Sequence, residues 1–300
     1  MRILRLYVFG SKGQVACSVR EAARDHSDVV VGFGGRPDVD ILRQDLVEKA
    51  LQEFAPDVVI NAAAYTAVDR AESEPELAFA TNRDGARIVA QAAERMGVPL
   101  LHLSTDYVFD GKKESPYIET DATAPMSVYG RSKLEGELAV AAASERHIVL
   151  RTAWVFSPFG SNFVRTMLRL ANSHDKLTVV DDQIGCPTYA PDIAVAMLSI
   201  ARKIAHSGWR QEFAGVTHLA GPDEVTWCDF ARRIMCDLER IGDRSVPVES
   251  IPTAAYPTAA VRPANSRLCC DRLASIFDIR MPPLESSLKQ CVARLVATQQ

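Results

Sequence analysis

The 300-residue sequence has little that would place it in a membrane or on a nucleic acid. No stretch reaches the roughly 18 to 20 apolar residues that a bilayer-spanning helix needs. The formal net charge is −4, and no long run of lysine and arginine occurs, which disfavours polynucleotides and anionic membranes as partners. The sequence therefore predicts a cytoplasmic protein with neither a membrane nor a nucleic-acid partner.

Paired cysteines and clustered histidines are also lacking. The seven cysteines include no Cys-x-x-Cys motif, and the neighbours Cys269 and Cys270 are poor candidates for a disulfide. An odd, scattered set of cysteines indicates free thiols in a reducing compartment. The six histidines do not fall at the spacing of metal ligands, so we predict no metal site.

Short apolar runs alternate with helical patterns in the first half of the chain. Strands are expected at residues 3–9, 29–32, 57–62, 99–104 and 147–152, and helices between them at 42–54, 75–96 and 127–143. Strands that are apolar on both faces and joined by helices form a parallel sheet covered on both sides. The pattern predicts an α/β fold with a Rossmann-type, doubly wound parallel sheet.

The alternation weakens after about residue 155. Helices are expected at 162–171, 192–205, 226–241, 271–277 and 284–296, with Thr226 as a cap and one more strand at 217–221. We therefore expect one domain over residues 1–155 and a smaller mixed α/β lobe over 156–300. Within that lobe, a segment near residues 190–207 is expected to return to the first domain.

Gly10 and Gly13 lie in a Gly-x-x-Gly-x-x-Ala turn between the first strand and the first helix. Small residues there let the backbone approach a pyrophosphate, which the helix N-terminus attracts. A tight turn without a ligand would look the same, but its place at the first junction favours a dinucleotide.

No carboxylate ends the second strand, whereas Arg36 follows it. A guanidinium suits a 2′-phosphate, although Arg36 could equally be a solvated loop residue, so we predict NADPH with NADH as the alternative.

Tyr129 and Lys133 are four residues apart in a helical pattern and so share one face. A neighbouring ammonium favours tyrosinate, so we expect Lys133 to lower the pKa of Tyr129 and make it a general acid near neutral pH. Carbonyl reduction needs such an acid, because hydride transfer leaves an alkoxide. The pair alone is a weak signal, but Thr105 ends the preceding strand, where a hydroxyl can polarise a carbonyl.

The order of glycine turn, strand-end hydroxyl and Tyr-x-x-x-Lys resembles the extended short-chain dehydrogenase/reductase superfamily. Within it, eight blocks are similar to the dTDP-4-dehydrorhamnose reductase family: residues 61–72, 104–111, 119–125, 128–137, 150–156, 162–163, 182–188 and 262–266. That family reduces the 4-keto group of dTDP-4-dehydro-L-rhamnose with NAD(P)H, giving dTDP-L-rhamnose for cell-surface polysaccharide such as lipopolysaccharide O-antigen. The resemblance implies a dTDP-sugar as substrate.

The resemblance also implies roles for individual residues. The implied catalytic residues are Thr105, Tyr129 and Lys133. Together with the glycine turn and Arg36, the cofactor-binding residues are Gly10, Gly13, Gln14, Val15, Arg36, Asp40, Ile41, Ala64, Tyr65, Thr66, Tyr129 and Lys133. The substrate-binding residues are Thr105, Asp106, Tyr129, Trp154, Arg262 and Asn265. For Trp154 the alternative is core packing, and for Arg262 and Asn265 it is a hydrogen-bonded pair that fixes a loop.

Some features depart from the family or leave other functions open. Ala16 stands where the family usually has glycine, and Pro191 and Arg294 lie where some members hold magnesium at a dimer interface. We therefore predict no metal and leave a homodimer open.

A related epimerase or dehydratase is one alternative function, although Asp106 lacks the adjacent glutamate expected of a dehydratase. A non-catalytic, NADP-binding regulatory subunit, like that of methionine adenosyltransferase, is another; the complete set of Thr105, Tyr129 and Lys133 favours the enzyme.

Overall fold

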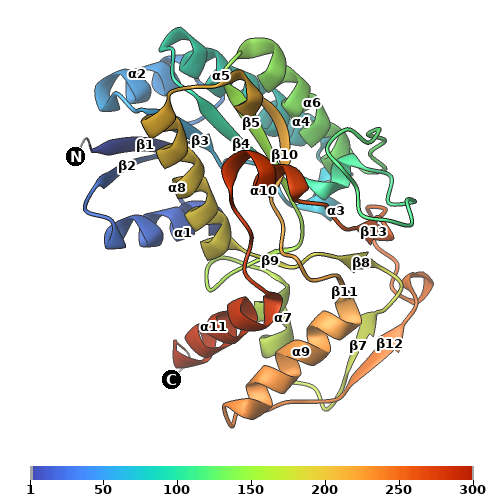
Figure 1. Cartoon of the computed structure of the whole chain (residues 1–300). Coiled ribbons are helices and arrows are strands. Elements are labelled where there is room, and N and C mark those ends of the chain that lie inside the picture. Colours follow the sequence, from blue (N-terminus) through green and yellow to red (C-terminus); the bar gives the residue numbers. More distant parts are fainter. Residues whose placement is uncertain (1–2, 299–300) are drawn as a thin grey trace.

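The computed structural model describes residues 3–298, and a six-stranded sheet lies at its centre (Figure 1). The strand order is β10-β5-β4-β3-β1-β2, and every pairing is parallel. The strands are β1 (Leu4–Phe9), β2 (Val29–Gly34), β3 (Val58–Asn61), β4 (Leu100–Thr105), β5 (His147–Thr152) and β10 (Gly215–His218). The doubly wound α/β fold predicted from the alternation is confirmed.

Helices cover both faces of this sheet. On one face α1 (Gln14–Ala22) and α8 (Ala190–Ser207) pack together over β1 and its neighbours. On the other lie α2 (Gln44–Phe54), α5 (Ala86–Arg95) and α6 (Val128–Ala143), in the upper part of Figure 1. Because both faces are covered, β1, β3 and β4 are almost entirely buried, which explains their continuous apolar runs.

Two expectations about single elements were wrong. The segment expected as one helix over 75–96 is divided into α4 (Pro75–Phe79), a π-helical turn (Ala80–Gly85) and α5. The strand expected in the smaller lobe is β10, which pairs with β5 and so extends the central sheet. β10 joins the central sheet because α8 carries the chain back over that sheet before β10 begins. The spacing of apolar residues along the sequence does not show that the chain returns in this way.

The remaining elements form a smaller lobe, in the lower half of Figure 1. Its core is lined by α7 (Phe163–Ala171), α9 (Trp227–Arg240) and α11 (Leu284–Ala297). Short sheets complete it: β7 (Leu177–Val180) with β12 (Val248–Ile251), β6 (Val155–Phe156) with β9 (Thr188–Tyr189), and β8 (Ile184–Gly185) between β11 (Val225–Thr226) and β13 (Asn265–Ser266). The short helices α3 (Val68–Ala71) and α10 (Asp271–Phe277) belong to connections. Thr226 caps α9 as expected, accepting a hydrogen bond from the Asp229 amide at 3.1 Å.

Candidate active site

A crevice opens where the direction of winding reverses in the sheet. The chain runs from β1 outward to β2 and then crosses to β3 on the other side of β1, so the loops after β1 and β3 diverge. A cavity of about 280 Å³ lies at this point. Its lining includes six residues predicted to bind the cofactor: Gly10, Gly13, Arg36, Asp40, Ile41 and Ala64.

The two glycines of the first loop serve different needs. Gly10 has φ +103°, and a Cβ there would lie 2.8 Å from the carbonyl carbon of Ala62, so its own fold requires glycine. Gly13 has φ −71°, and the nearest atom to an added Cβ would be the Gly10 oxygen at 3.5 Å, an ordinary contact. Gly13 also offers no side chain to cap the first N–H groups of α1, which leaves them for an anion. This turn fits a pyrophosphate.

Arg36 supplies positive charge to the same cavity. It follows β2 directly after Gly35, whose missing side chain lets this loop pass close to Ser11. Asp40 also lines the cavity, but one of its oxygens accepts the Leu42 amide at 3.0 Å and so shapes the turn. The Arg36 guanidinium and Ser11 fit a phosphate on the adenosine ribose.

Six residues predicted to bind the cofactor do not line this cavity: Tyr129 and Lys133, which are described below, and Gln14, Val15, Tyr65 and Thr66. Gln14 Oε1 instead accepts hydrogen bonds from Ser157 Oγ at 2.7 Å and from Asn162 Nδ2 at 3.0 Å, which ties α1 to the smaller lobe. Val15 is buried in the sheet core. The Tyr65 hydroxyl donates to Glu74 at 2.6 Å, and Thr66, beside it, is exposed. In the loop directly after β3, the residues that line the cavity are Ala62, Ala63 and Ala64.

The three predicted catalytic residues meet where β4 ends and α6 begins. The Ser127 hydroxyl caps α6 by accepting the Gly130 amide at 3.1 Å, which places Tyr129 and Lys133 in the first turns. Thr105 is the last residue of β4. Lys133 Nζ donates to the Leu103 carbonyl at 2.6 Å, two residues before Thr105. The face of α6 that carries Tyr129 and Lys133 therefore packs against the carboxyl end of β4.

Burial dominates the proton affinities of this group. It raises the pKa of Tyr129 to about 12, with the Thr105 hydroxyl lowering it and the Asp106 charge raising it. The expectation that Lys133 lowers the pKa of Tyr129 is therefore wrong for this structure, because the ammonium donates to Leu103 O while the phenol is desolvated. Burial lowers the pKa of Lys133 to about 8, against the opposing charge of Glu137. At neutral pH the tyrosine is a phenol and the lysine mostly an ammonium ion.

Asp106 is a buried acid next to the reactive group. Burial raises its pKa to about 6, although hydrogen bonds from Ser266 and Thr105 oppose the shift. Thr105 Oγ1 donates to Asp106 Oδ1 at 3.0 Å. The carboxylate is thus connected to the hydroxyl beside Tyr129 and sits between the two lobes, since Ser266 belongs to β13.

A second cavity of about 590 Å³ lies in the smaller lobe. It reaches Tyr107, whose ring stands edge-on to the ring of Tyr129 at 5.4 Å between centroids. Its walls are mainly apolar and aromatic, from Phe163, Met167 and Trp227, and Arg262 contributes a cation. No site role was assigned to Trp227 or Phe163 from the sequence, because aromatic residues on an amphipathic helix look like ordinary core.

Trp154 supports this cavity without lining it. Its ring stacks on Trp227 at 3.5 Å between centroids and 9° between planes. On its other side lies Gly185, where an added Cβ would come 2.4 Å from the indole. Trp154 also has φ +46°, a conformation that costs a non-glycine residue on the order of 1–3 kcal/mol and persists only when its surroundings fix it. Trp154 thus packs behind Trp227 and does not line the cavity itself, and its predicted contact with the substrate stays a prediction.

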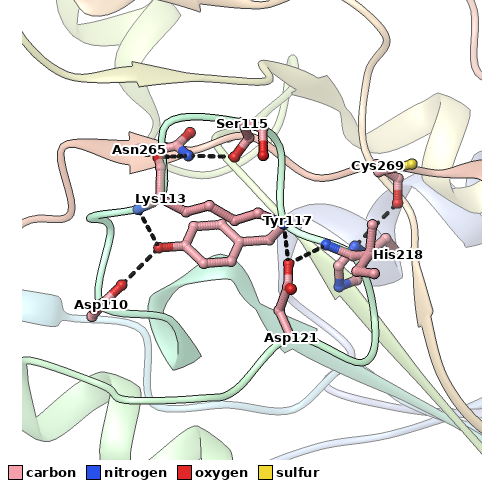
Figure 2. A network of polar contacts seen from close by, with 9 residues as sticks. Asp110, Lys113, Ser115, Tyr117, Asp121, His218, Asn265 and Cys269 are labelled. Atoms are coloured by element: carbon pink, nitrogen blue, oxygen red, sulfur yellow. Dashed lines mark hydrogen bonds and ion pairs between the residues drawn. The ribbon is translucent and has the colours of Figure 1, made fainter.

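The two remaining residues predicted to bind substrate have different surroundings. Arg262 lines the second cavity and forms a two-point ion pair with Asp69, at 2.7 and 3.0 Å, which links the smaller lobe to α3. Asn265 donates to the carbonyls of Lys113 and Ser115 at 2.6 and 2.9 Å, and Figure 2 shows its amide directed at Ser115. Its oxygen accepts two bonds from Arg267. Asn265 therefore fixes the loop before α6, and no donor is left for a substrate.

One further polar residue, missed in the sequence, supports the site. Asn82 lies in the π-helical turn; it accepts the Tyr65 amide at 2.8 Å and donates to Ser132 of α6 at 2.9 Å. It therefore connects the loop after β3 to the helix that carries Tyr129. The sequence signal was hidden, because a π-helical turn reads as continuous helix.

Two other kinds of site are absent from the part of the chain that the structure describes. No cluster of three or more histidine, cysteine, aspartate or glutamate side chains among residues 3–298 could hold a metal ion. In the same residues, no helix combines the length and the apolar character needed to span a membrane.

Comparison with known proteins identifies the family. The model of the RmlD substrate binding domain matches residues 3–297. A curated dTDP-4-dehydrorhamnose reductase from Sinorhizobium fredii is 50% identical over 98% of both chains, and that of Escherichia coli is 35% identical over 98% of this chain and 99% of its own. The crystal structure of the Bacillus anthracis dTDP-4-dehydrorhamnose reductase in complex with NADP is 32% identical and superposes with a TM-score of 0.88, covering 98% of this chain and 99% of that one. The chain therefore belongs to the dTDP-4-dehydrorhamnose reductase family.

Proposed function

We propose that this chain reduces the 4-keto group of dTDP-4-dehydro-L-rhamnose to dTDP-L-rhamnose, with NADPH as the preferred cofactor and NADH as a second one. The observation that carries the proposal is the meeting of Thr105, Tyr129 and Lys133 at the carboxyl edge of the sheet. Polysaccharide precursor synthesis in the cytoplasm is the setting we infer.

Gly10, Gly13 and Arg36 are proposed to hold the dinucleotide in the cavity at the switch point, with Asp40, Ile41 and Ala64 completing its walls. When bound there, NADPH would supply the hydride. We propose that residues 1–155 carry most of this function, and that residues 156–300, apart from α8, mainly bind the sugar nucleotide. Gln14, Val15 and Tyr65 support the elements around this cavity, and a direct contact of these residues or of Thr66 with the cofactor stays a prediction.

Tyr129 is proposed to donate its phenolic proton to the oxygen that becomes negative during reduction. Its pKa of about 12 keeps it protonated at neutral pH, and an alkoxide is a strong enough base to take that proton. Thr105 is proposed to polarise the carbonyl, and Lys133 is proposed to bind the ribose of the nicotinamide. Asp106 is placed to hold a sugar hydroxyl.

The nucleotide part of the substrate is proposed to lie in the second cavity. Phe163 and Trp227 offer flat apolar surface to the base, with Trp154 holding the Trp227 ring in place. Arg262 is available to a diphosphate if it leaves or shares Asp69. Asn265 takes no direct part.

The test is an initial-rate assay of purified protein with dTDP-4-dehydro-L-rhamnose and each reduced cofactor. The proposal requires stoichiometric loss of NADPH absorbance and formation of dTDP-L-rhamnose. Conversion of the sugar without net oxidation of NADPH would instead identify an epimerase. Cofactor binding without any conversion would favour the regulatory subunit.

A further inference from the structure

A buried ion pair lies beneath the proposed catalytic residues. The Glu137 carboxylate accepts hydrogen bonds from Ser104 Oγ at 2.5 Å and from Arg151 at 2.6 and 2.9 Å. Both charged side chains are about 95% buried, with 4% and 5% of their surface exposed. Apolar residues of similar volume often stabilise a core as well as a buried ion pair does. Stability alone therefore does not account for this pair.

The position of Glu137 connects the strand and the helix of the site. It lies one helical turn after Lys133 on α6, on the same face. Its partner Ser104 stands in β4 between Leu103, whose carbonyl accepts Lys133 Nζ, and Thr105. A single carboxylate thus joins the strand end that carries Thr105 to the helix that carries Tyr129 and Lys133.

Glu137 also balances the charge around Lys133. Lys133 is 2% exposed, and the charge of Glu137 raises its pKa while burial lowers it. The other titratable groups around Lys133 and Glu137 are Tyr129 on α6, His102 on β4, Asp106 after β4, Arg151 on β5 and His218 on β10. Burial keeps both histidines neutral, since their pKa values are lowered. Without Glu137, the buried Lys133 would lose the charge that raises its pKa, and the buried Arg151 would lose its carboxylate partner.

We propose that Glu137 is a positioning residue for the reductase reaction: it fixes the end of β4 against α6 and keeps the buried Lys133 amine in its ammonium form. The inference rests on the proposed function for its catalytic consequence. Its electrostatic part concerns the cofactor-free protein and is measured there.

The first measurement is an NMR titration of protein labelled with [ε-¹³C]lysine, in which a Lys133→Met variant identifies the Lys133 signal. In Glu137→Gln the titration midpoint of Lys133 falls by about one pH unit or more. Glu137→Asp retains the charge and therefore most of the midpoint. Glu135→Gln, whose carboxylate is exposed and pairs with Arg83 at 3.1 Å, is the matched control on the same helix and leaves the midpoint unchanged. An unchanged midpoint in folded Glu137→Gln overturns the electrostatic part.

The second measurement is the pH profile of turnover. The alkaline limb of kcat moves to lower pH in Glu137→Gln and stays in place in Ser104→Ala, which loses a tie between β4 and α6 but no charge. Ser104→Ala lowers kcat several-fold at unchanged KM, and wild-type kcat in that variant overturns the positioning part. If Glu137→Gln does not fold, Glu137→Asp and Ser104→Ala still decide, because a normal kcat in both contradicts the proposal. If the wild-type chain does not turn over the sugar, the proposed function is wrong. The NMR titration then still tests whether Glu137 raises the titration midpoint of Lys133.

Discussion

Two glycines of the first loop give opposite predictions for the same change to alanine. Gly10 has φ +103° and would place a Cβ 2.8 Å from backbone atoms of Ala62 and Ala63. The conformation alone costs on the order of 1–3 kcal/mol, and the backbone contact adds to it. Gly10→Ala therefore lowers the free energy of unfolding by at least that much and displaces the loop after β3.

Gly13→Ala is the matched case, because its Cβ would make an ordinary 3.5 Å contact with the Gly10 oxygen. Loss of glycine at a helix cap and reduced entropy of the unfolded chain nearly cancel, so stability stays within about 1 kcal/mol of wild type. The new methyl group nevertheless enters the space proposed for the pyrophosphate. We expect NADPH affinity to fall about 10-fold or more, which is about 1.4 kcal/mol.

The assay combines thermal unfolding of both variants with titration calorimetry of NADPH. The reasoning predicts a lower Tm for Gly10→Ala and, for Gly13→Ala, a wild-type Tm with weakened binding. If Gly13→Ala binds NADPH as tightly as the wild-type chain, the glycine turn does not hold the pyrophosphate, and the cofactor assignment of this cavity is refuted.

Three further changes test other parts of the site. Arg36→Ala raises KM for NADPH about 10-fold through loss of a charge-assisted contact, with little effect on NADH; equal effects on both cofactors contradict a 2′-phosphate contact. Trp227→Ala raises KM for the sugar nucleotide but leaves NADPH affinity intact, as steady-state kinetics and calorimetry can show; an unchanged KM would remove the base from the second cavity. Asp106 has a raised pKa of about 6, so its folded-state penalty is absent at pH 4 and develops as pH rises to 6. Asp106→Asn therefore stabilises the fold at pH 7.5, by up to about 3 kcal/mol, and changes it little at pH 4; equal Tm shifts at both pH values would contradict this sign.

The sequence was informative where local patterns carry the structure. Buried parallel strands, helix caps such as Ser127 and Thr226, and the glycine turn all leave short-range signals. The helical spacing of Tyr129 and Lys133 and the place of Thr105 at a strand end singled these residues out, and the family resemblance gave them roles. They meet because α6 packs against the end of β4.

Other features depend on contacts between distant residues and could not be read from a pattern. The partner of Arg262 is Asp69, 193 positions away, and Trp154 stacks on a tryptophan from another helix. The pKa of Tyr129 was expected to fall, but it rises because desolvation exceeds the effect of nearby donors. Burial and long-range pairing are properties of the folded chain, so they required the structure.

Tyr129→Phe tests the central claim most directly, since it removes one oxygen from the proposed proton donor and leaves the ring packed against Tyr107. NADPH oxidation with dTDP-4-dehydro-L-rhamnose is measured for this variant and for the wild-type chain, with calorimetry to check that cofactor affinity is unchanged. The account predicts a loss of kcat of about 10²- to 10⁴-fold, the usual contribution of a general acid. Turnover close to wild type in a folded, NADPH-binding Tyr129→Phe protein would contradict it.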